Sequence, residues 1–350
     1  MKKLSWFNKL VFVLNLLVAI TTFVAYMLPF LAPKLFPILA ALTLFLPIML
    51  IFNLLFFGYW AMQVKRQMLL SGLVLLIGTT FINKFYKFGN SSVAVATTHS
   101  IMSYNVRLFN KFKWSDKETV PEEISDFVKE KKPDILCIQE FTEQSKFDSS
   151  PYEYKFILKK GQKIKTSQAI FSKYRIVNSG EIAFPNSNNN TTFAYIKIKN
   201  DTIRVYSMHL ESIKITPDVA DINQDINEIN QTKSGRIFRM ISKAFKQQQL
   251  QSELIMQHKL KCKHRVVICG DMNNSAFSYV YRNIKGELQD AFVQAGNGFG
   301  KTYDFRYYPA RIDYLFFDKS LPVNTFENFT EIIDSDHFPI MATFKILPRG

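Results

Sequence analysis

The first 90 residues contain no aspartate or glutamate, although they hold eight lysines and arginines. A soluble domain exposes both signs of charge, so ninety residues without a carboxylate are hard to reconcile with a solvated surface. Three segments within this region carry no charge at all, and a membrane-spanning helix needs about 20 apolar residues. The sequence therefore predicts a membrane anchor over residues 1–90 with about three transmembrane helices, near 10–30, 35–60 and 67–83.

Two other interpretations of this region are weaker. A cleaved signal peptide has a shorter apolar core and is not followed by two further apolar stretches. A buried helical hairpin in a soluble domain would still need carboxylates on its surface. The third apolar stretch contains Gly72 and Gly78 and reaches only the lower end of the spanning length.

The distribution of lysine and arginine predicts the orientation of the anchor, because short cytoplasmic loops carry the excess of these residues. The three lysines before residue 10 and the Lys65–Arg66 pair favour the cytoplasm. Three spans in the plasma or inner membrane then place the rest of the chain outside the cytoplasm. Lys84 and Lys87 oppose this orientation, and the remainder returns to the cytoplasm if the third stretch does not span.

The charge balance first suggests a nucleic-acid-binding protein, since the 350 residues include 44 Lys+Arg against 29 Asp+Glu. Eight of the positive charges belong to the anchor, which leaves 36 basic and 29 acidic residues, a net +7, in the remainder. This charge suits an anionic substrate without selecting one. Three cysteines exclude a disulfide-framework protein.

The pattern changes after residue 98 to short apolar runs separated by turns, with two amphipathic helical stretches at 121–131 and 232–260. Strands of this number and spacing, with few long helices, predict an α/β or α+β sandwich of layered sheets over residues 98–347. The expected strands are 100–106, 134–139, 168–171, 192–198, 203–208, 265–269, 312–317 and 340–346. Residues 216–231 are expected to form a mobile inserted loop.

Two basic stretches allow more than one interpretation. Residues 155–165 are compatible with a phosphate-binding face, but a solvated hairpin is favoured. Residues 236–246 form a basic amphipathic stretch that is compatible with an anionic membrane surface, but packing on a sheet is favoured.

Polar residues recur at the ends of the predicted strands, where they would be costly in a core. Each alone is explained by capping or turn formation, but strand ends of one sandwich can converge at one edge. Two of them, Glu140 and Asp336, offer the hard oxygen ligands that Mg²⁺ and Mn²⁺ prefer, and no Cys/His cluster has zinc spacing. The set comprises Asn105, Glu140, His209, Asp271, Asn273, Asp313, Asp336 and His337.

The chemistry of this set favours hydrolysis of a phosphate ester. Two histidines can lie on either side of a phosphate, one near the nucleophile and one near the leaving group. An aspartate can hold an imidazole in the required tautomer, and amides can bind phosphoryl oxygens without adding negative charge. The combination suits metal-assisted attack of water on phosphorus.

The same residues, in order along the chain, resemble the motifs of the endonuclease/exonuclease/phosphatase superfamily, the deoxyribonuclease I-like enzymes. The resemblance covers about residues 98–347, and it implies a four-layer α/β sandwich of two mixed β-sheets flanked by helices. The matching motifs are Asn105, Gln139–Glu140, His209, Gly270–Asn273, Arg311–Tyr314 and Ser335–Pro339.

The resemblance also implies roles for individual residues. Glu140 would be the principal ligand of Mg²⁺ or Mn²⁺, with Asn105 and Asp336 around the same ion. His337 would be the general base, oriented by Asp313. The remaining residues would act on the substrate: Asp271 and Asn273 position the nucleophile and the phosphate, while His209 contacts the phosphate and assists the leaving group. Gln168 lies on a strand that often lines the site in this family.

The sequence therefore predicts a membrane-tethered, divalent-metal-dependent phosphoesterase whose substrate is nucleic acid or a phospholipid headgroup. The alternative is a catalytically inactive phosphate-binding module of the same fold. A third hypothesis, that the spans themselves act in transport, is opposed by the absence of intramembrane charge. The expected partners are the bilayer and the anionic substrate, with no protein partner predicted.

Overall fold

The computed structural model describes residues 4–89, 98–143, 145–160, 166–213, 231–306 and 308–348. The chain forms two compact units. The first comprises Met1–Phe85, Ile213–Gln249 and Ser275–Arg282, and the second comprises Tyr86–Ser212, Leu250–Asn274 and Asn283–Gly350. The inserted loop predicted at 216–231 lies outside the described residues except for Gln231, which begins a helix.

Apolar helices make up the N-terminal part of the first unit. They are α1 (Trp6–Met27), η1 (Leu28–Phe30), α2 (Pro37–Ala40), η2 (Ala41–Leu44), α3 (Leu46–Met62) and α4 (Met68–Ile82). Within the described residues, one helix is long and apolar enough to cross a membrane, Trp6–Phe30 with 25 residues. The pair Pro37–Leu44 and Leu46–Met62 reaches that standard together but is bent by 63°. The 15-residue α4 is shorter, so one or two candidate spans are present where three were predicted.

Polar side chains connect these helices from within. Asn15 of α1 donates to Ser71 Oγ of α4 at 2.7 Å and accepts from Trp60 Nε1 of α3 at 3.0 Å. Asn53 of α3 donates to Thr22 Oγ1 of α1 at 2.9 Å. Large apolar side chains on the same three helices point outward instead and are exposed, among them Leu17, Leu54, Leu55, Leu69, Leu73 and Leu76. Hydrogen-bonded polar side chains thus lie inside the bundle beside buried apolar ones such as Leu46 and Val74, while many large apolar side chains are exposed.

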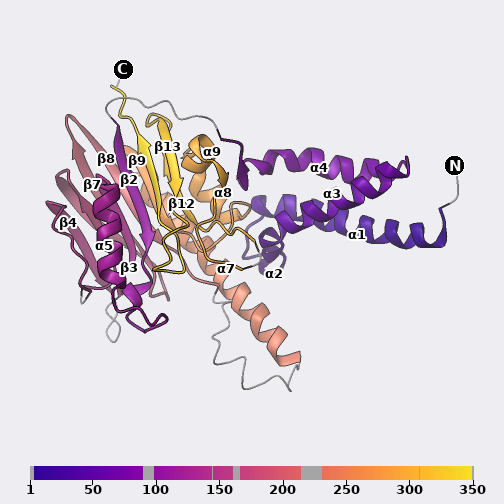
Figure 1. Cartoon of the computed structure of the whole chain (residues 1–350), viewed down its shortest axis with the longest axis horizontal. Coiled ribbons are helices and arrows are strands. Elements are labelled where there is room, and N and C mark those ends of the chain that lie inside the picture. Colours follow the sequence, from indigo (N-terminus) through magenta and orange to yellow (C-terminus); the bar gives the residue numbers. More distant parts are fainter. Residues whose placement is uncertain are drawn as a thin grey trace. The chain divides into compact units, whose positions relative to one another are not determined.

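Two six-stranded sheets form the second unit (Figure 1). The first sheet has the order β13 (Val323–Asn328), β14 (Ile340–Phe344), β2 (His99–Asn105), β3 (Ile135–Phe141), β5 (Thr166–Ser172), β4 (Tyr154–Lys160). The second has the order β10 (Gln289–Asp290), β12 (Asp313–Phe317), β9 (Arg265–Asp271), β8 (Asp201–His209), β7 (Asn190–Ile198), β6 (Ile176–Ala183). A small ribbon pairs β1 (Tyr86–Lys87) with β11 (Gly298–Phe299).

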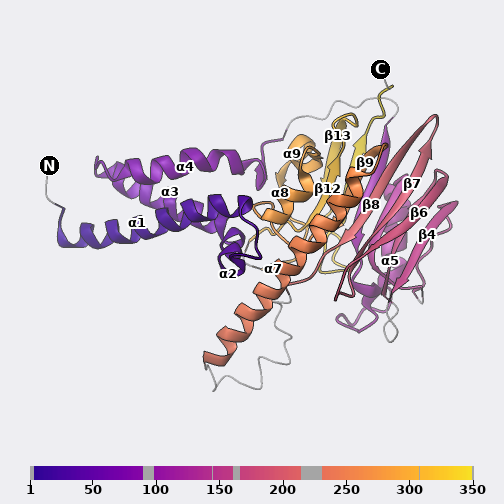
Figure 2. The same cartoon turned by 180° about the vertical axis from the view of Figure 1, so that it is seen from behind.

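Alternation along the strands creates two apolar layers. On β2, Ile101 joins the core between the two sheets, whereas Met102 and Tyr104 face the opposite side and pack with α5 (Val120–Lys131). The C-terminal part of α7 (Gln231–Leu260) covers the other sheet (Figure 2). There, His258 of α7 contacts the ring of Phe193. Helix, sheet, sheet and helix form four layers, as predicted. The described residues also include three shorter helices, namely η3 (Arg107–Asn110), α8 (Tyr279–Lys285) and α9 (Ala291–Ala295).

The N-terminal part of α7 belongs to the first unit, and its apolar face packs on a different element than the sequence predicted. Ile241 and Phe245 are buried in a cluster with Ala40 of the α2 segment. The prediction that this basic stretch packs on a sheet is therefore wrong, because its apolar face is covered by another helix.

The strand order explains why polar strand ends converge. Each sheet contains one parallel pair, β2 with β3 and β8 with β9. Carboxyl ends of parallel strands lie at the same edge, so His209 comes to lie opposite Asp271. The neighbouring β12 is antiparallel to β9 and therefore begins at that edge, with Asp313 opposite Asp271.

Candidate functional site

Asp271, the last residue of β9, lies at the centre of the site and is only 1% exposed. Its Oδ1 accepts a hydrogen bond from the backbone N–H of Asn273 at 2.8 Å. Its Oδ2 accepts from Asn273 Nδ2 at 3.0 Å and from Asn105 Nδ2 at 3.1 Å. These amide donors hold the carboxylate in one orientation without neutralising it.

His337 and Asp313 form a buried pair beside Asp271. The imidazole Nδ1 lies 3.0 Å from Asp313 Oδ2, which favours the tautomer that carries its proton on Nδ1. His337 Nε2 then faces Asp271 Oδ2 at 3.7 Å. The hydroxyl of Thr302 accepts the backbone N–H of Asp313 at 3.0 Å, which fixes the start of β12.

Glu140 reaches the same edge from the first sheet. The register of β3 shifts between Ile138 and Phe141, and Glu140 has a φ of 52°. Such an irregularity re-aims a side chain that regular alternation would point elsewhere. Glu140 Oε1 lies 3.7 Å from His209 Nε2, and the same nitrogen lies 3.6 Å from Asp271 Oδ2.

Asp336 joins the site through a residue that the sequence analysis did not single out. Arg107 Nε lies 3.4 Å from Asp336 Oδ2. Arg107 begins η3, in which residues 107–110 all have positive φ between 43° and 59°. This left-handed turn brings the guanidinium back to the strand ends. The residue types at 107–110 do not predict a left-handed turn. The only sequence signal for Arg107 is its position two residues after Asn105.

Burial and mutual repulsion shift the pKa values of these groups. Burial raises the pKa of Glu140, with Asp336 adding to the effect. Burial likewise raises the pKa of Asp271 to about 6. Burial alone would lower the pKa of His337, but Asp313 and Asp271 outweigh it and raise that pKa to about 10. Burial lowers the pKa of His209. The site thus holds more carboxylate than its own cations balance.

This surplus fits a divalent cation. The carboxylates of Glu140 and Asp336 could supply hard oxygen ligands for Mg²⁺ or Mn²⁺, and a bound cation would favour their ionised forms. Within the described residues, the carboxylate and imidazole atoms of Asp271, Asp313 and His337 also lie within 4.8 Å of one another. That second group is less suited to a metal, because the hydrogen bond between His337 and Asp313 already uses two of its donor atoms.

Asn105 is placed at the site but not oriented as a ligand. Its Nδ2 points to the carboxylates of Asp271 and Glu140, at 3.1 and 3.5 Å, while its Oδ1 accepts the N–H of Arg107 at 3.1 Å. A metal ligand would have to present the amide oxygen. Ligation by Asn105 therefore needs rotation of its amide group.

Gln168 does not reach the site edge. It is buried and donates to the backbone oxygen and Oδ1 of Asn190, both at 2.6 Å, while it accepts from Ser207 Oγ at 3.0 Å. Ser207 in turn accepts from Gln139 Nε2 at 2.8 Å. The Gln168 side chain therefore connects the two sheets, and both its amide nitrogen and its amide oxygen are hydrogen-bonded.

The turn into Asp271 depends on Gly270. This residue has a φ of 119°, and an added Cβ would lie 2.1 Å from the backbone oxygen of Met208. Gly270→Ala is therefore expected to destabilise the protein by more than about 3 kcal/mol. Thermal unfolding of the full-length protein in detergent measures the effect. Gly235→Ala, at a helical position with nothing within 4 Å, is the control, and an equally stable Gly270→Ala would refute this account of the turn.

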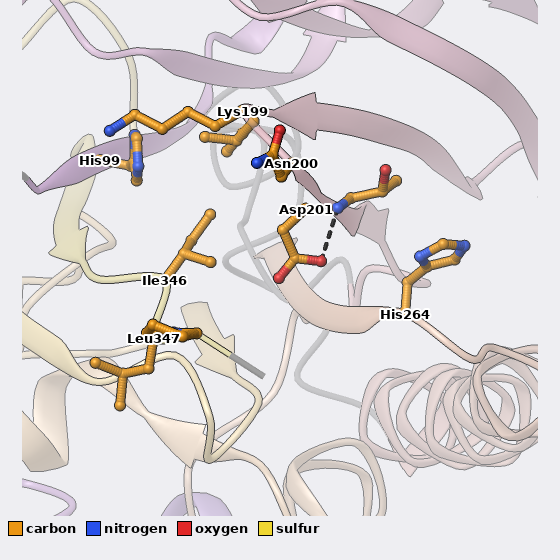
Figure 3. Close-up of a pocket in the computed structure, with 10 residues that line it drawn as sticks. His99, Lys199, Asn200, Asp201, His264, Ile346 and Leu347 are labelled. Carbon is orange, nitrogen blue, oxygen red and sulfur yellow. Dashed lines mark hydrogen bonds between the residues drawn. The ribbon is translucent and has the colours of Figure 1, made fainter. Parts of the chain in front are cut away.

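A separate cavity of about 610 Å³ lies at the opposite ends of the strands (Figure 3). It is lined by His99 and Asp201, the first residues of β2 and β8, and by His264. Two of its ionisable groups already have partners: His99 Nδ1 lies 2.8 Å from Tyr174 Oη, and Asp201 Oδ2 lies 2.8 Å from Arg265 Nη1. The polar cluster at the carboxyl ends of the parallel strands remains the better candidate for chemistry.

Comparison with known protein families gives two matches. The model described as Endonuclease/Exonuclease/phosphatase family matches residues 102–337. The model described as Domain of unknown function (DUF8431) matches residues 8–85. A search of curated proteins finds no match.

Solved structures share the fold at low sequence identity. An endonuclease/exonuclease/phosphatase family protein from Leptotrichia buccalis is 17% identical with a TM-score of 0.51, over 71% of this chain and 100% of that one. The human Nocturnin catalytic domain with bound sulfate is 16% identical with a TM-score of 0.51, over 73% and 97%. D. rerio TDP2 complexed with single-strand DNA product is 16% identical with a TM-score of 0.51, over 71% and 99%.

Proposed function

The chain belongs to the endonuclease/exonuclease/phosphatase family, whose members are typically metal-dependent phosphoesterases, and on this basis we propose that it hydrolyses phosphate esters with Mg²⁺ or Mn²⁺. The observation that carries the proposal is the convergence of Glu140, Asp271 and the His337–Asp313 pair at one edge of two sheets. A purely structural role would not require so many buried or partly buried ionisable groups in contact.

Each side chain has a role that its geometry supports. In its neutral form, which a nearby bound cation would favour, His337 Nε2 accepts a proton from the attacking water, and Asp313 stabilises the resulting imidazolium through Nδ1. Asp271 and Asn273 orient the water and the phosphate. His209, between Glu140 and Asp271, binds a phosphoryl oxygen and supports departure of the leaving group.

Glu140 and Asp336 would hold the cation, with Asn105 beside them. The bound metal would polarise the phosphate and stabilise charge that develops on its oxygens. Arg107 keeps Asp336 in place through their 3.4 Å ion pair.

The alternative, an inactive phosphate-binding module, finds less support. Binding alone would not need the proton-accepting pair of His337 and Asp313, which is costly to bury. The pair is complete, and its free Nε2 is directed at the central carboxylate.

Two substrate classes fit the proposal, and one experiment separates them. The DNA product named for D. rerio TDP2 favours nucleic acid, whereas an anchor in a bilayer favours a phospholipid headgroup. The full-length protein in detergent is incubated with Mg²⁺ or Mn²⁺ and with DNA, RNA, phospholipids or inositol phosphates. Metal-dependent turnover of one class identifies the substrate, and no turnover of any of them opposes the proposed activity.

We further propose that residues 1–90 anchor the protein in a membrane. The polarity of the helical bundle supports this, since Asn15 and Asn53 are buried while many leucines are exposed. Lipid accepts that arrangement, because hydrogen-bonding side chains between helices avoid the hydrocarbon. In water the same surface would be a large exposed apolar patch.

The ends of the helices support three crossings. At one end of the bundle, Tyr59 of α3 donates to Asn8 of α1 at 2.6 Å. At the other end, Phe81 of α4 contacts Phe277, and Thr43 accepts from Ser275 at 3.4 Å. The chain leaves α1 and α4 on the same side, which is the arrangement of three spans. The 15 residues of α4 span about 22 Å, so the bilayer would thin locally around it.

Topology reporters test this arrangement. With a cytoplasmic N-terminus, a reporter fused after residue 95 is expected to be active only outside the cytoplasm. A reporter fused after Val64, between α3 and α4, is expected to be active only inside. A cytoplasmic signal at both positions would remove the third span and place the catalytic unit in the cytoplasm.

A further inference from the structure

The first unit contains a cavity of about 360 Å³ between α2 and the N-terminal part of α7. Three of its lining residues are cations, Arg239, Lys243 and Lys246. The remaining lining residues are Ser242, a hydroxyl donor, and Ile38, an exposed apolar side chain. The cavity thus combines a concentrated positive charge with one apolar wall.

Within the part of the chain that the structure describes, no carboxylate is paired with the lysines of this cavity. The three cations follow each other at i, i+4 and i+7 on one helix face, a spacing at which like charges repel. Among residues 231–260 the only acidic residue is Glu253, two turns beyond Lys246. Within the described residues, no ion pair joins Lys243 or Lys246 to a carboxylate, whereas Lys117, Lys129 and Lys173 each have one. An anionic ligand would relieve this repulsion.

The cavity lies near the end of the first candidate span. Trp6–Phe30 ends seven residues before α2 begins at Pro37. The backbone N–H of Lys34 in that connection donates to Gln249 Oε1 of α7 at 2.9 Å. Ile241 and Phe245 of the same helix pack on Ala40. The basic face of α7 is therefore held at the level where an apolar span gives way to polar surroundings.

We propose that the cavity lined by Ile38, Arg239, Ser242, Lys243 and Lys246 binds the phosphate-bearing headgroup of an anionic phospholipid. The inference rests on the proposed membrane anchor but is independent of the catalytic residues. The cations and Ser242 contact the phosphate, and Ile38 contacts the start of an acyl chain. Such a site fixes the rotation of α7 against the bilayer. The helix that carries the site, α7, continues into the second unit.

Native mass spectrometry of the full-length protein in detergent tests the site, with phosphatidylglycerol and phosphatidylcholine as probes. The wild type is expected to retain phosphatidylglycerol in preference to phosphatidylcholine. The double variant Lys243→Glu/Lys246→Glu is expected to bind phosphatidylglycerol about 30-fold more weakly, since each lysine near an anionic lipid contributes about a factor of five. Lys261→Glu/Lys263→Glu changes the net charge equally on exposed residues elsewhere and is expected to keep the preference.

Two results would overturn the inference. One is retention of phosphatidylglycerol by the Lys243→Glu/Lys246→Glu variant at the wild-type level. The other is displacement of the lipid by inorganic phosphate at similar concentrations, which would show a site for a free anion. Turnover of a soluble phosphodiester is measured on all three proteins. Equal turnover confirms that the catalytic site is intact, and absent turnover in the wild type would count against the proposed enzyme activity alone.

Discussion

His337→Ala is expected to lower turnover by about 10²–10⁴-fold, the usual contribution of a general base. The substitution removes Nε2, the nitrogen that faces Asp271 at 3.7 Å, and leaves the Asp313 carboxylate without its 3.0 Å partner. Initial rates with saturating Mg²⁺ or Mn²⁺ measure the loss. The Michaelis constant should change far less than turnover, because His337 acts on the water and not on the substrate.

A matched histidine variant separates catalysis from folding. His99 begins β2 and lines the cavity at the far end of the strands, so His99→Ala is expected to keep wild-type turnover. Thermal unfolding of both variants shows whether each remains folded. If His337→Ala is folded and retains full activity on the identified substrate, another residue is the base.

Glu140→Gln is expected to have the second-largest effect. The variant keeps the shape of the side chain but removes the charge of the principal predicted metal ligand. We expect the metal concentration for half-maximal activity to rise by roughly 10²-fold or more, because a metal ligand contributes several kcal/mol. A titration of chelator-treated protein with Mg²⁺ and Mn²⁺ measures this shift.

The control for Glu140→Gln is Glu327→Gln, which removes the same charge from an exposed position on β13. Its metal titration is expected to match the wild type. If Glu140→Gln also matched the wild type, the metal would be held elsewhere, and the group of Asp271, Asp313 and His337 would become the better candidate.

Much of the second unit was predictable because its polar residues lie at strand ends. Runs such as residues 265–269 are apolar until Asp271, and the antiparallel or parallel pairing of neighbours then brings such ends together. The fold and the predicted residues could be anticipated from this pattern. All eight predicted site residues lie at this edge of the sheets, namely Asn105, Glu140, His209, Asp271, Asn273, Asp313, Asp336 and His337.

Other features depend on geometry that a linear pattern does not carry. The left-handed turn after Asn105 brings Arg107 to Asp336, and the orientation of the Asn105 amide follows from that turn. Segment 236–246 was predicted to pack on a sheet. Amphipathicity indicates that one face of a helix is covered, but it does not identify the element that covers it. Its apolar face instead meets Ala40 in the first unit.

The most direct test of the proposed activity is phosphodiester hydrolysis by the full-length protein after removal of bound metal. A simple substrate such as bis(4-nitrophenyl) phosphate is followed before and after addition of Mg²⁺ or Mn²⁺. We expect no turnover without metal and turnover on its addition, with a much lower rate for His337→Ala under the same conditions. Hydrolysis that is unaffected by metal removal, or no hydrolysis of this or any phosphate ester with either metal, would contradict it.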